Sequence, residues 1–341
     1  MEFTIFDRQT DRQTDRQTDR QTDRQNSKTF YWMRTIALLA VVMTHAHFQA
    51  TDVRILNHLV GSFCRSGVAI FFFTAGVYWK WSPPLSTLKH FAVKLLPPWI
   101  LFGSLLYAIS TLKDGFSLTS WFFWLVGKNT YLWYLTIYVV IQIMFSILRI
   151  EGKHSLMMCI LITVVSRTMT AYLGISGYRA FLNPLNWVGF FASGVAYSYY
   201  GYRRKKQTKK TIGFLQFAAI VVIIFTVYFD TRIFNTNSGY FTYSDCFSQF
   251  AWIVVLLFVC SNLAELHGYE IGKASLPIYL MHISVIGFVT SRFAVGVPLA
   301  ILLSIVIICA LYMCLFIGWK VAATLKLDKL FSTVTGFTPY G

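Results

Sequence analysis

Four ionisable side chains lie within long apolar runs of the sequence: Arg34, His45, Arg65 and His282. Each costs a few kcal/mol in hydrocarbon unless it is paired or hydrated, so such residues mark candidate functional sites. A neutral imidazole, whose pKa lies near neutrality, can take a proton from a hydroxyl as that hydroxyl attacks. The histidines therefore predict acid–base chemistry within a membrane. The alternative is that each side chain bonds a neighbouring carbonyl and only stabilises packing.

Two of these residues are expected at the same depth. His45 lies about 21 Å from the cytoplasmic end of a predicted span, at a helical rise of about 1.5 Å per residue. Arg65, on a span that enters from outside, lies about 18 Å from the inner surface. A histidine and an arginine at one level of a helical bundle predict a polar pocket that opens outward.

The elements that position these residues are predicted to be membrane helices. The chain has 341 residues, of which 56% are hydrophobic and 13% charged, about half the charged share of soluble proteins. At about 18–23 residues a span, the apolar runs predict an all-α polytopic bundle of about ten transmembrane helices. The expected spans are 31–50, 57–79, 91–111, 131–149, 155–174, 183–200, 212–229, 244–264, 274–292 and 297–320, with an interfacial aromatic segment at 118–126.

The net charge of +16 does not indicate nucleic-acid binding, because acidic and basic residues balance before Tyr31 and the excess lies at the ends of apolar runs. Basic residues gather in alternate joints, above all in the cluster Arg203–Lys210, which predicts that both termini are cytoplasmic. The six cysteines form no CxxC pair, so neither a disulfide framework nor a metal site is predicted.

Residues 1–30 are predicted to form a disordered cytoplasmic tail, because four copies of Asp-Arg-Gln-Thr and most of a fifth fill positions 7–25 without an apolar member. A tetranucleotide repeat in the gene would encode such a tract, and its slippage would switch expression on and off. Residues 31–320 are expected to form the membrane domain, and residues 321–341 a second cytoplasmic tail.

Several segments resemble the acyltransferase-3 family of membrane acyltransferases, which modify sugars and other envelope molecules. Arg34–His45 (RTIALLAVVMTH) is similar to the opening helix of that family, and Arg65–Gly76 (RSGVAIFFFTAG) to its second motif. Ala69 stands where proline is common in the family and Ala75 where serine is usual. Further matches are Leu132–Leu135, Asn186–Trp187 with Phe191 and Gly194, and Ser275–His282.

The resemblance implies an O-acyltransferase of a bacterial inner membrane. It would move an acetyl group from cytoplasmic acetyl-CoA to a hydroxyl of an envelope glycan or lipid-linked sugar. It implies that His45 is the general base, and that Arg34 and Arg65 orient carbonyls or stabilise negative charge. Trp133, Tyr279 and His282 would line the substrate pocket.

The family often has arginines before a proline in the loop after its second span, where the acyl donor is thought to bind. Here Lys89 and Lys94 occupy that stretch, and lysine lacks the planar fork of arginine. Two alternatives stay open: a transporter or flippase for a lipid-linked glycan, which would use the same intramembrane charges, and a cation channel. No inverted repeat and no filter-like segment supports either alternative.

Overall fold

The computed structural model describes residues 27–46, 54–112, 115–201, 209–232, 240–290 and 296–339, and every regular element in these ranges is a helix. The first helix covers residues 27–44. It is followed by α2 (Arg54–Tyr78), α3 (Pro84–Lys94), α4 (Leu96–Ser110), α5 (Leu118–Val126), α6 (Trp133–Leu148), α7 (Lys153–Tyr172), α8 (Tyr178–Phe181), the 3₁₀ turn η1 (Pro184–Asn186), α9 (Val188–Ala196), the π-helical turn η2 (Tyr197–Gly201), α10 (Lys209–Arg232), α11 (Asp245–Leu263), α12 (Glu270–Lys273), α13 (Ser275–Thr290), α14 (Val297–Thr324) and α15 (Asp328–Thr335).

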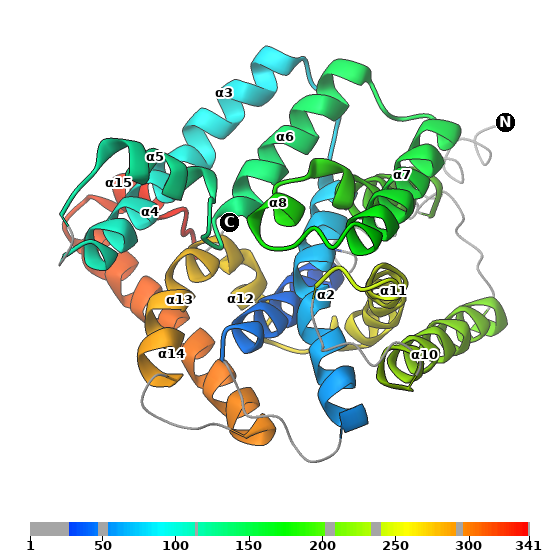
Figure 1. Cartoon of the computed structure of the whole chain (residues 1–341). Coiled ribbons are helices and arrows are strands. Elements are labelled where there is room, and N and C mark those ends of the chain that lie inside the picture. Colours follow the sequence, from blue (N-terminus) through cyan, green and yellow to red (C-terminus); the bar gives the residue numbers. More distant parts are fainter. Residues whose placement is uncertain are drawn as a thin grey trace, which may run out of the picture.

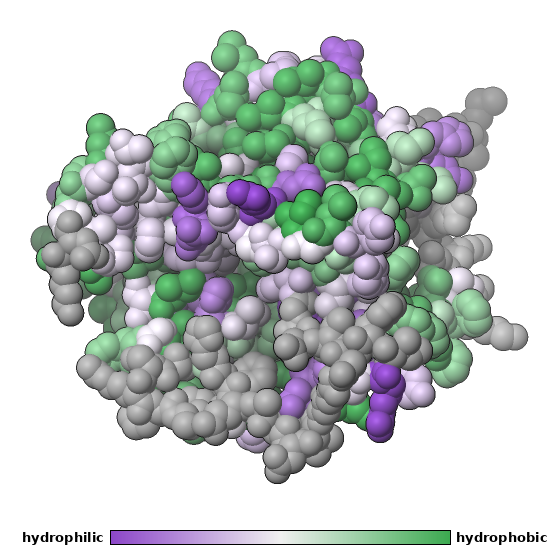
Figure 2. Space-filling model, in the orientation of Figure 1, coloured by the Kyte–Doolittle hydropathy of each residue, from purple (hydrophilic) through white to green (hydrophobic). Residues whose placement is uncertain are grey.

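The helices surround α2, which runs through the middle of the molecule with α13 and α14 on one side and α10 and α11 on the other (Figure 1). A continuous core of apolar side chains joins the first helix, α2, α6, α9 and α13. The outer surface is also largely apolar, and Figure 2 shows broad hydrophobic areas over α3 and α6. An outside as apolar as the inside suits helices that are surrounded by lipid.

Five of the described helices are long and apolar enough to cross a membrane, and they coincide with five predicted spans: Ile55–Tyr78, Lys153–Tyr172, Thr211–Arg232, Asp245–Leu263 and Val297–Thr324. Two more predicted spans correspond to shorter apolar helices, Trp133–Leu148 and Ser275–Val289. The prediction of an all-α membrane protein is therefore confirmed at this level.

The predicted span 91–111 is broken. Helices α3 and α4 meet at Leu95 with a bend of 48°, and together they make one candidate span. The break precedes Pro97 and Pro98, which occupy the first turn of α4. Proline lacks an amide donor and disfavours the helical conformation of the preceding residue, so a continuous helix is disfavoured here.

The predicted span 183–200 is also discontinuous. Its residues form η1, the nine-residue helix α9 and the π turn η2. Helix α9 nevertheless lies at the centre of the fold because it packs tightly against α2. A Cβ added at Gly194 would lie 2.0 Å from the Phe73 carbonyl oxygen, and one at Gly76 would lie 2.1 Å from that of Phe191. The two glycines therefore allow the two backbones to touch.

Several predicted features lie outside the described residues. They include the repeats at 7–25, the stretch from 47 to 53 at the end of the first predicted span, and the basic residues 203–206.

Candidate active site

The first helix carries Arg34 near its start and ends one residue before His45. The two are eleven positions apart, which is about 16 Å along a helix axis. The amides of His45 and Ala46 bond the carbonyls of Val42 and Met43, both at 3.1 Å, so the last turn is tightened to a three-residue spacing. The predicted helix over 31–50 thus ends at residue 44, and His45 projects from its end.

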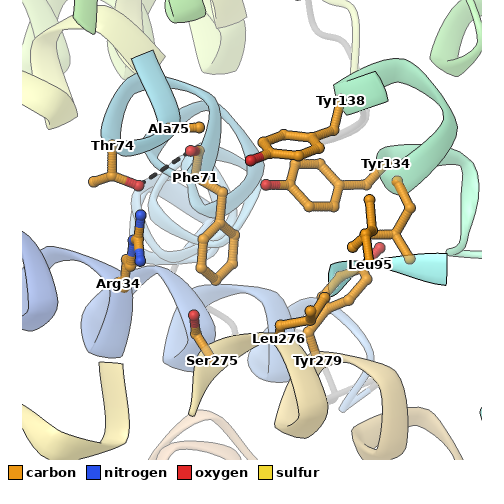
Figure 3. Close-up of a pocket in the computed structure, with 11 residues that line it drawn as sticks. Arg34, Phe71, Thr74, Ala75, Leu95, Tyr134, Tyr138, Ser275, Leu276 and Tyr279 are labelled. Carbon is orange, nitrogen blue, oxygen red and sulfur yellow. Dashed lines mark hydrogen bonds between the residues drawn. The ribbon is translucent and has the colours of Figure 1, made fainter. Parts of the chain in front are cut away.

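A cavity of about 140 Å³ lies beside Arg34. Figure 3 shows the guanidinium entering it from the first helix, the rings of Tyr134 and Tyr138 from α6, and Ser275 from the start of α13. The Thr74 hydroxyl, next to Arg34, donates to the Phe71 carbonyl at 3.1 Å. We call this space the Arg34 cavity. Its apolar wall with one cation and several hydroxyl groups can hold a neutral chain that ends in a polar carbonyl.

A larger cavity of about 410 Å³ lies at the other end of the first helix and is lined by His45. Its walls come from the first helix, the loop before α6, α8 and the segment before α11. The other lining residues are Val41, Thr44, Val68, Gly127, Asn129, Thr130, Tyr131, Trp133, Gly177, Tyr178, Phe181, Tyr240 and Tyr279. We call it the His45 cavity. Aromatic rings together with amide and hydroxyl groups are typical of a site that binds a sugar or another hydroxylated molecule.

Aromatic stacking and hydrogen bonding hold the wall of the His45 cavity in place. The Trp133 ring lies 4.8 Å from Phe181 and 4.8 Å from Trp187, between centroids. Gly127 allows the loop to approach, since its φ of 97° is left-handed and a Cβ there would lie 2.2 Å from the Trp133 backbone. Burial raises the pKa of Tyr240, so its phenol stays protonated at neutral pH and can donate a hydrogen bond into the cavity.

Tyr279 is on the wall of both cavities. Its ring lies 5.5 Å from Tyr131 and 5.4 Å from Tyr134, and its hydroxyl donates to the Tyr131 carbonyl. Tyr131 in turn donates to the Leu280 carbonyl at 2.6 Å. These reciprocal bonds tie α13 to the residues before α6 and fix the ring that lines both cavities.

His282 lies directly behind His45, with 5.3 Å between the ring centroids. It is fully buried, and its Nδ1 bonds the Tyr279 carbonyl. A carbonyl only accepts, so Nδ1 carries the proton and Nε2 has a lone pair. Among the described residues, this Nε2 has no hydrogen-bond partner. His282 is therefore placed to support His45, although it does not itself line either cavity in the described part of the chain.

Arg65 does not line the His45 cavity but lies in a buried ionic network. Its Nε donates to Asp245 Oδ1 at 2.8 Å, and Arg167 Nη1 approaches Oδ2 of the same carboxylate at 3.4 Å. Gln249 bonds both partners, donating to Asp245 at 2.6 Å and accepting from Arg167 at 3.0 Å. The sequence predicted that Arg65 and His45 share a polar pocket. Arg65 instead pairs with a carboxylate, which compensates a buried cation.

The ionic network packs against aromatic residues that contact the wall of the His45 cavity. The Arg167 guanidinium lies 4.3 Å from the Trp187 ring and 4.5 Å from the Phe241 ring, and Phe241 packs against Phe181 at 5.1 Å. The Nε of Arg167 donates to the Asn186 carbonyl at 3.0 Å. Asp245 and Arg167 are opposite charges within apolar runs, and such charges tend to pair in membrane proteins. Our prediction did not use this signal. It also did not include the cavity tyrosines Tyr131, Tyr134 and Tyr138, which do not stand out among the 19 tyrosines of the chain.

Lys89 and Lys94 lie exposed on α3 and line neither cavity in the described part of the chain. Lys94 directly precedes Leu95, which does line the Arg34 cavity, so the bend between α3 and α4 brings this lysine near that cavity. Within the described ranges, no group of three or more His, Cys, Asp or Glu side chains is arranged to hold a metal ion.

Comparison with known proteins identifies the family of this site. A family model described as an acyltransferase domain (Acyl_transf_3) matches residues 29–319, which include the first helix, both cavities and the ionic network. No curated protein and no solved structure matches the chain. The match agrees with the resemblance of the Arg34–His45 and Arg65–Gly76 segments, and the apolar helices agree with a multi-pass membrane protein. The chain therefore belongs to the acyltransferase-3 family of membrane acyltransferases.

Proposed function

We propose that the protein is an O-acetyltransferase of a bacterial inner membrane. It transfers the acetyl group of acetyl-CoA to a hydroxyl of a cell-envelope glycan, such as lipopolysaccharide or lipooligosaccharide. The donor occupies the Arg34 cavity from the cytoplasmic side, and the acceptor sugar occupies the His45 cavity from the opposite side. No metal takes part in this proposal.

The observation that carries the proposal is the meeting of the two cavities at Tyr279. A narrow cavity with one guanidinium suits the arm and thioester of the donor, and a wider cavity with aromatic and polar walls suits a sugar. Because Tyr279 lines both cavities, the two substrates can approach each other there without either crossing the bilayer. His45 lies on the acceptor side of that boundary.

In the proposed step, His45 takes the proton of the acceptor hydroxyl while its oxygen attacks the thioester carbonyl carbon. A carbon–oxygen bond forms, the carbon–sulfur bond breaks, and the thiolate of CoA leaves and is protonated by the histidine. Arg34 orients the carbonyl groups of the donor arm in its own cavity. Transfer through an acetyl-histidine is the other chemically balanced route, in which His45 first attacks the thioester and the hydroxyl then attacks the acetyl group.

We also propose the topology and the regulation predicted from the sequence. Ten spans with both termini in the cytoplasm place the Arg34 end of the first helix on the side where CoA is available. The Asp-Arg-Gln-Thr repeats are encoded by a slipping tetranucleotide tract, so the enzyme is phase-variable. Mixed synonymous codons through residues 7–25, or an invariant tract among sibling colonies, would contradict phase variation.

The test compares envelope glycans from cells with and without the gene by mass spectrometry, with a His45→Ala strain as the third arm. The proposal requires one acetyl increment that is present only with the intact gene. Purified protein must also transfer radiolabelled acetyl from acetyl-CoA to the glycan of the deleted strain. Unchanged acetylation with altered amounts of surface glycan would instead support a flippase.

A further inference from the structure

Five cations and four aromatic rings form one continuous surface at the Arg34 end of the bundle. We call it the basic collar; its members are Lys28, Arg34, Lys80, Arg149 and Lys273 with Tyr31, Tyr78, Trp81 and Tyr269. None of these residues belongs to the chemistry proposed above except Arg34.

One half of the collar is built around Tyr31 of the first helix. Its ring stacks on Tyr269 at 6.5 Å between centroids. The Lys273 ammonium lies 5.6 Å from Tyr31, and the Lys28 ammonium lies 5.5 Å from Tyr269. Arg34 lies 6.0 Å from the same Tyr31 ring, so the cations alternate with stacked aromatic faces.

The other half is a groove of about 570 Å³ at the end of α2. Tyr78, Lys80 and Trp81 line it, and Tyr199 and Glu151 face them. The Arg149 guanidinium lies 4.6 Å from the Trp81 ring. Because Arg34 lies 5.1 Å from the Tyr78 ring, it joins this groove to the first half of the collar.

The collar carries more positive than negative charge. None of its five cations forms an ion pair with a carboxylate of the described residues, whose ion pairs are those of Arg65 and Arg167 with Asp245. Two carboxylates adjoin the collar: Glu151 accepts from the Tyr199 hydroxyl at 3.2 Å, and Glu270 accepts from the Gly268 amide at 2.9 Å. The surface is thus suited to a ligand with several negative charges and a flat ring.

The collar is also continuous with the Arg34 cavity. Thr74 lines that cavity and lies four residues before Tyr78, so both face the first helix about 6 Å apart along α2. On α13, Ser275 lines the cavity two residues after Lys273. A ligand on the collar can therefore extend a chain past Arg34 toward Tyr279.

We propose that the basic collar binds the nucleotide end of the acyl-CoA donor. The ammonium and guanidinium groups of Lys28, Lys80, Arg149 and Lys273 neutralise its diphosphate and ribose phosphate, and the adenine stacks in the groove beside Tyr78 and Trp81. The pantetheine arm then passes Arg34 into the cavity. This assignment rests on the proposed function and replaces Lys89 and Lys94 as the main contacts of the donor phosphates. Anionic lipid headgroups offer phosphates to the same cations, but they bring no ring to the aromatic faces.

The test measures binding of free CoA, which cannot transfer a group, to the full-length protein in phosphatidylcholine nanodiscs. The collar variant is Lys28→Gln with Lys80→Gln and Lys273→Gln. Its matched control is Lys326→Gln with Lys329→Gln, two exposed lysines near the C-terminus that lie outside both cavities. We expect the Kd for CoA to rise at least about tenfold in the collar variant, as loss of three partly exposed ionic contacts implies, and to stay unchanged in the control. If the triple variant does not fold, Lys80→Gln alone must still weaken binding, since Lys80 is an exposed residue outside any helix.

A second donor separates this inference from the proposed function. S-acetylpantetheine lacks the nucleotide, so the collar variant should transfer from it as fast as the wild type does. Equal affinity of variant and wild type for CoA would overturn the inference. In separate nanodiscs that also contain phosphatidylglycerol, loss of bound phosphatidylglycerol by the collar variant without loss of CoA affinity would assign the collar to lipid and overturn the inference as well. If the wild type binds CoA through the collar but transfers no acetyl group to any glycan, the proposed reaction fails while the collar assignment stands.

Discussion

At the scale of single residues, His45 is the side chain on which the proposed reaction depends. His45→Ala should lower the rate of acetyl transfer by about 10²–10⁴-fold, because a positioned general base supplies about that factor. The residue lies beyond the end of the first helix and is only partly buried, so the variant should fold. The rate is measured with radiolabelled acetyl-CoA, and folding by thermal stability in detergent.

The control for this variant is His154→Ala, which removes an exposed histidine at the start of α7. Its transfer rate should equal that of the wild type. A His45→Ala protein that retains the full rate would remove His45 from the mechanism, whatever its stability.

Asp245 is expected to matter for stability more than either of its arginine partners. Asp245→Ala leaves two buried guanidinium groups facing each other, whereas Arg65→Ala still leaves Arg167 to pair with the carboxylate. Breaking a buried ion pair by removing one partner costs about 3–5 kcal/mol. We therefore expect the unfolding temperature to fall more for Asp245→Ala than for Arg65→Ala. The opposite order would show that Arg65, and not the carboxylate, organises the network.

The sequence located the cavity residues better than it located their partners. Arg34 and His45 were identified as ionisable residues within apolar runs, and Trp133 and Tyr279 by resemblance to family motifs. All four line at least one of the two cavities. Arg65 was expected in one pocket with His45 but does not line that cavity, because depth along a helix axis gives no information about the direction of the side chain around that axis. Asp245 decides that direction, and its pairing depends on α11 packing against α2.

At the scale of helices, the contact between α2 and α9 is the closest approach that the site requires. Gly76→Ala and Gly194→Ala should each lower the yield of folded protein and its thermal stability, because the added methyl group would lie about 2 Å from a backbone oxygen of the other helix. Gly213→Ala on α10 is the matched control, since nothing lies within 4 Å of its added Cβ. Equal stability of all three variants in a detergent melt would mean that the two helices are further apart than the structure places them.

The helices were predictable to different degrees, for physical reasons. Continuous apolar runs such as Val297–Thr324 were predicted with nearly the right ends, because lipid requires an unbroken helix of that length. The breaks at Leu95 and after Ala196 were not predicted. There the backbone departs from the regular helix inside the protein, where neighbouring helices rather than hydropathy determine its course.

At the scale of the whole molecule, the charge distribution predicts the orientation in the membrane. A green fluorescent protein fused after Gly341 should be fluorescent, and alkaline phosphatase at the same position should be inactive, because both termini are expected in the cytoplasm. The reciprocal control places each reporter in the joint between α13 and α14, where the two activities should exchange. The same activity pattern at both positions would contradict the proposed topology and with it the cytoplasmic position of the basic collar.

Tyr279 lines both cavities, and this has a consequence for the membrane as a barrier to ions. If the cavities open to opposite sides as proposed, the Tyr279 ring forms part of the barrier between the two sides of the membrane. The reciprocal bonds between Tyr279 and Tyr131 then hold in place a ring that blocks the passage of ions. Tyr279→Gly should make vesicles that contain the protein leak protons, measured with an internal pH dye, while Tyr279→Phe should keep them tight. An enzyme that works across a bilayer in this way must hold its substrates close enough to react and still prevent ions from following them.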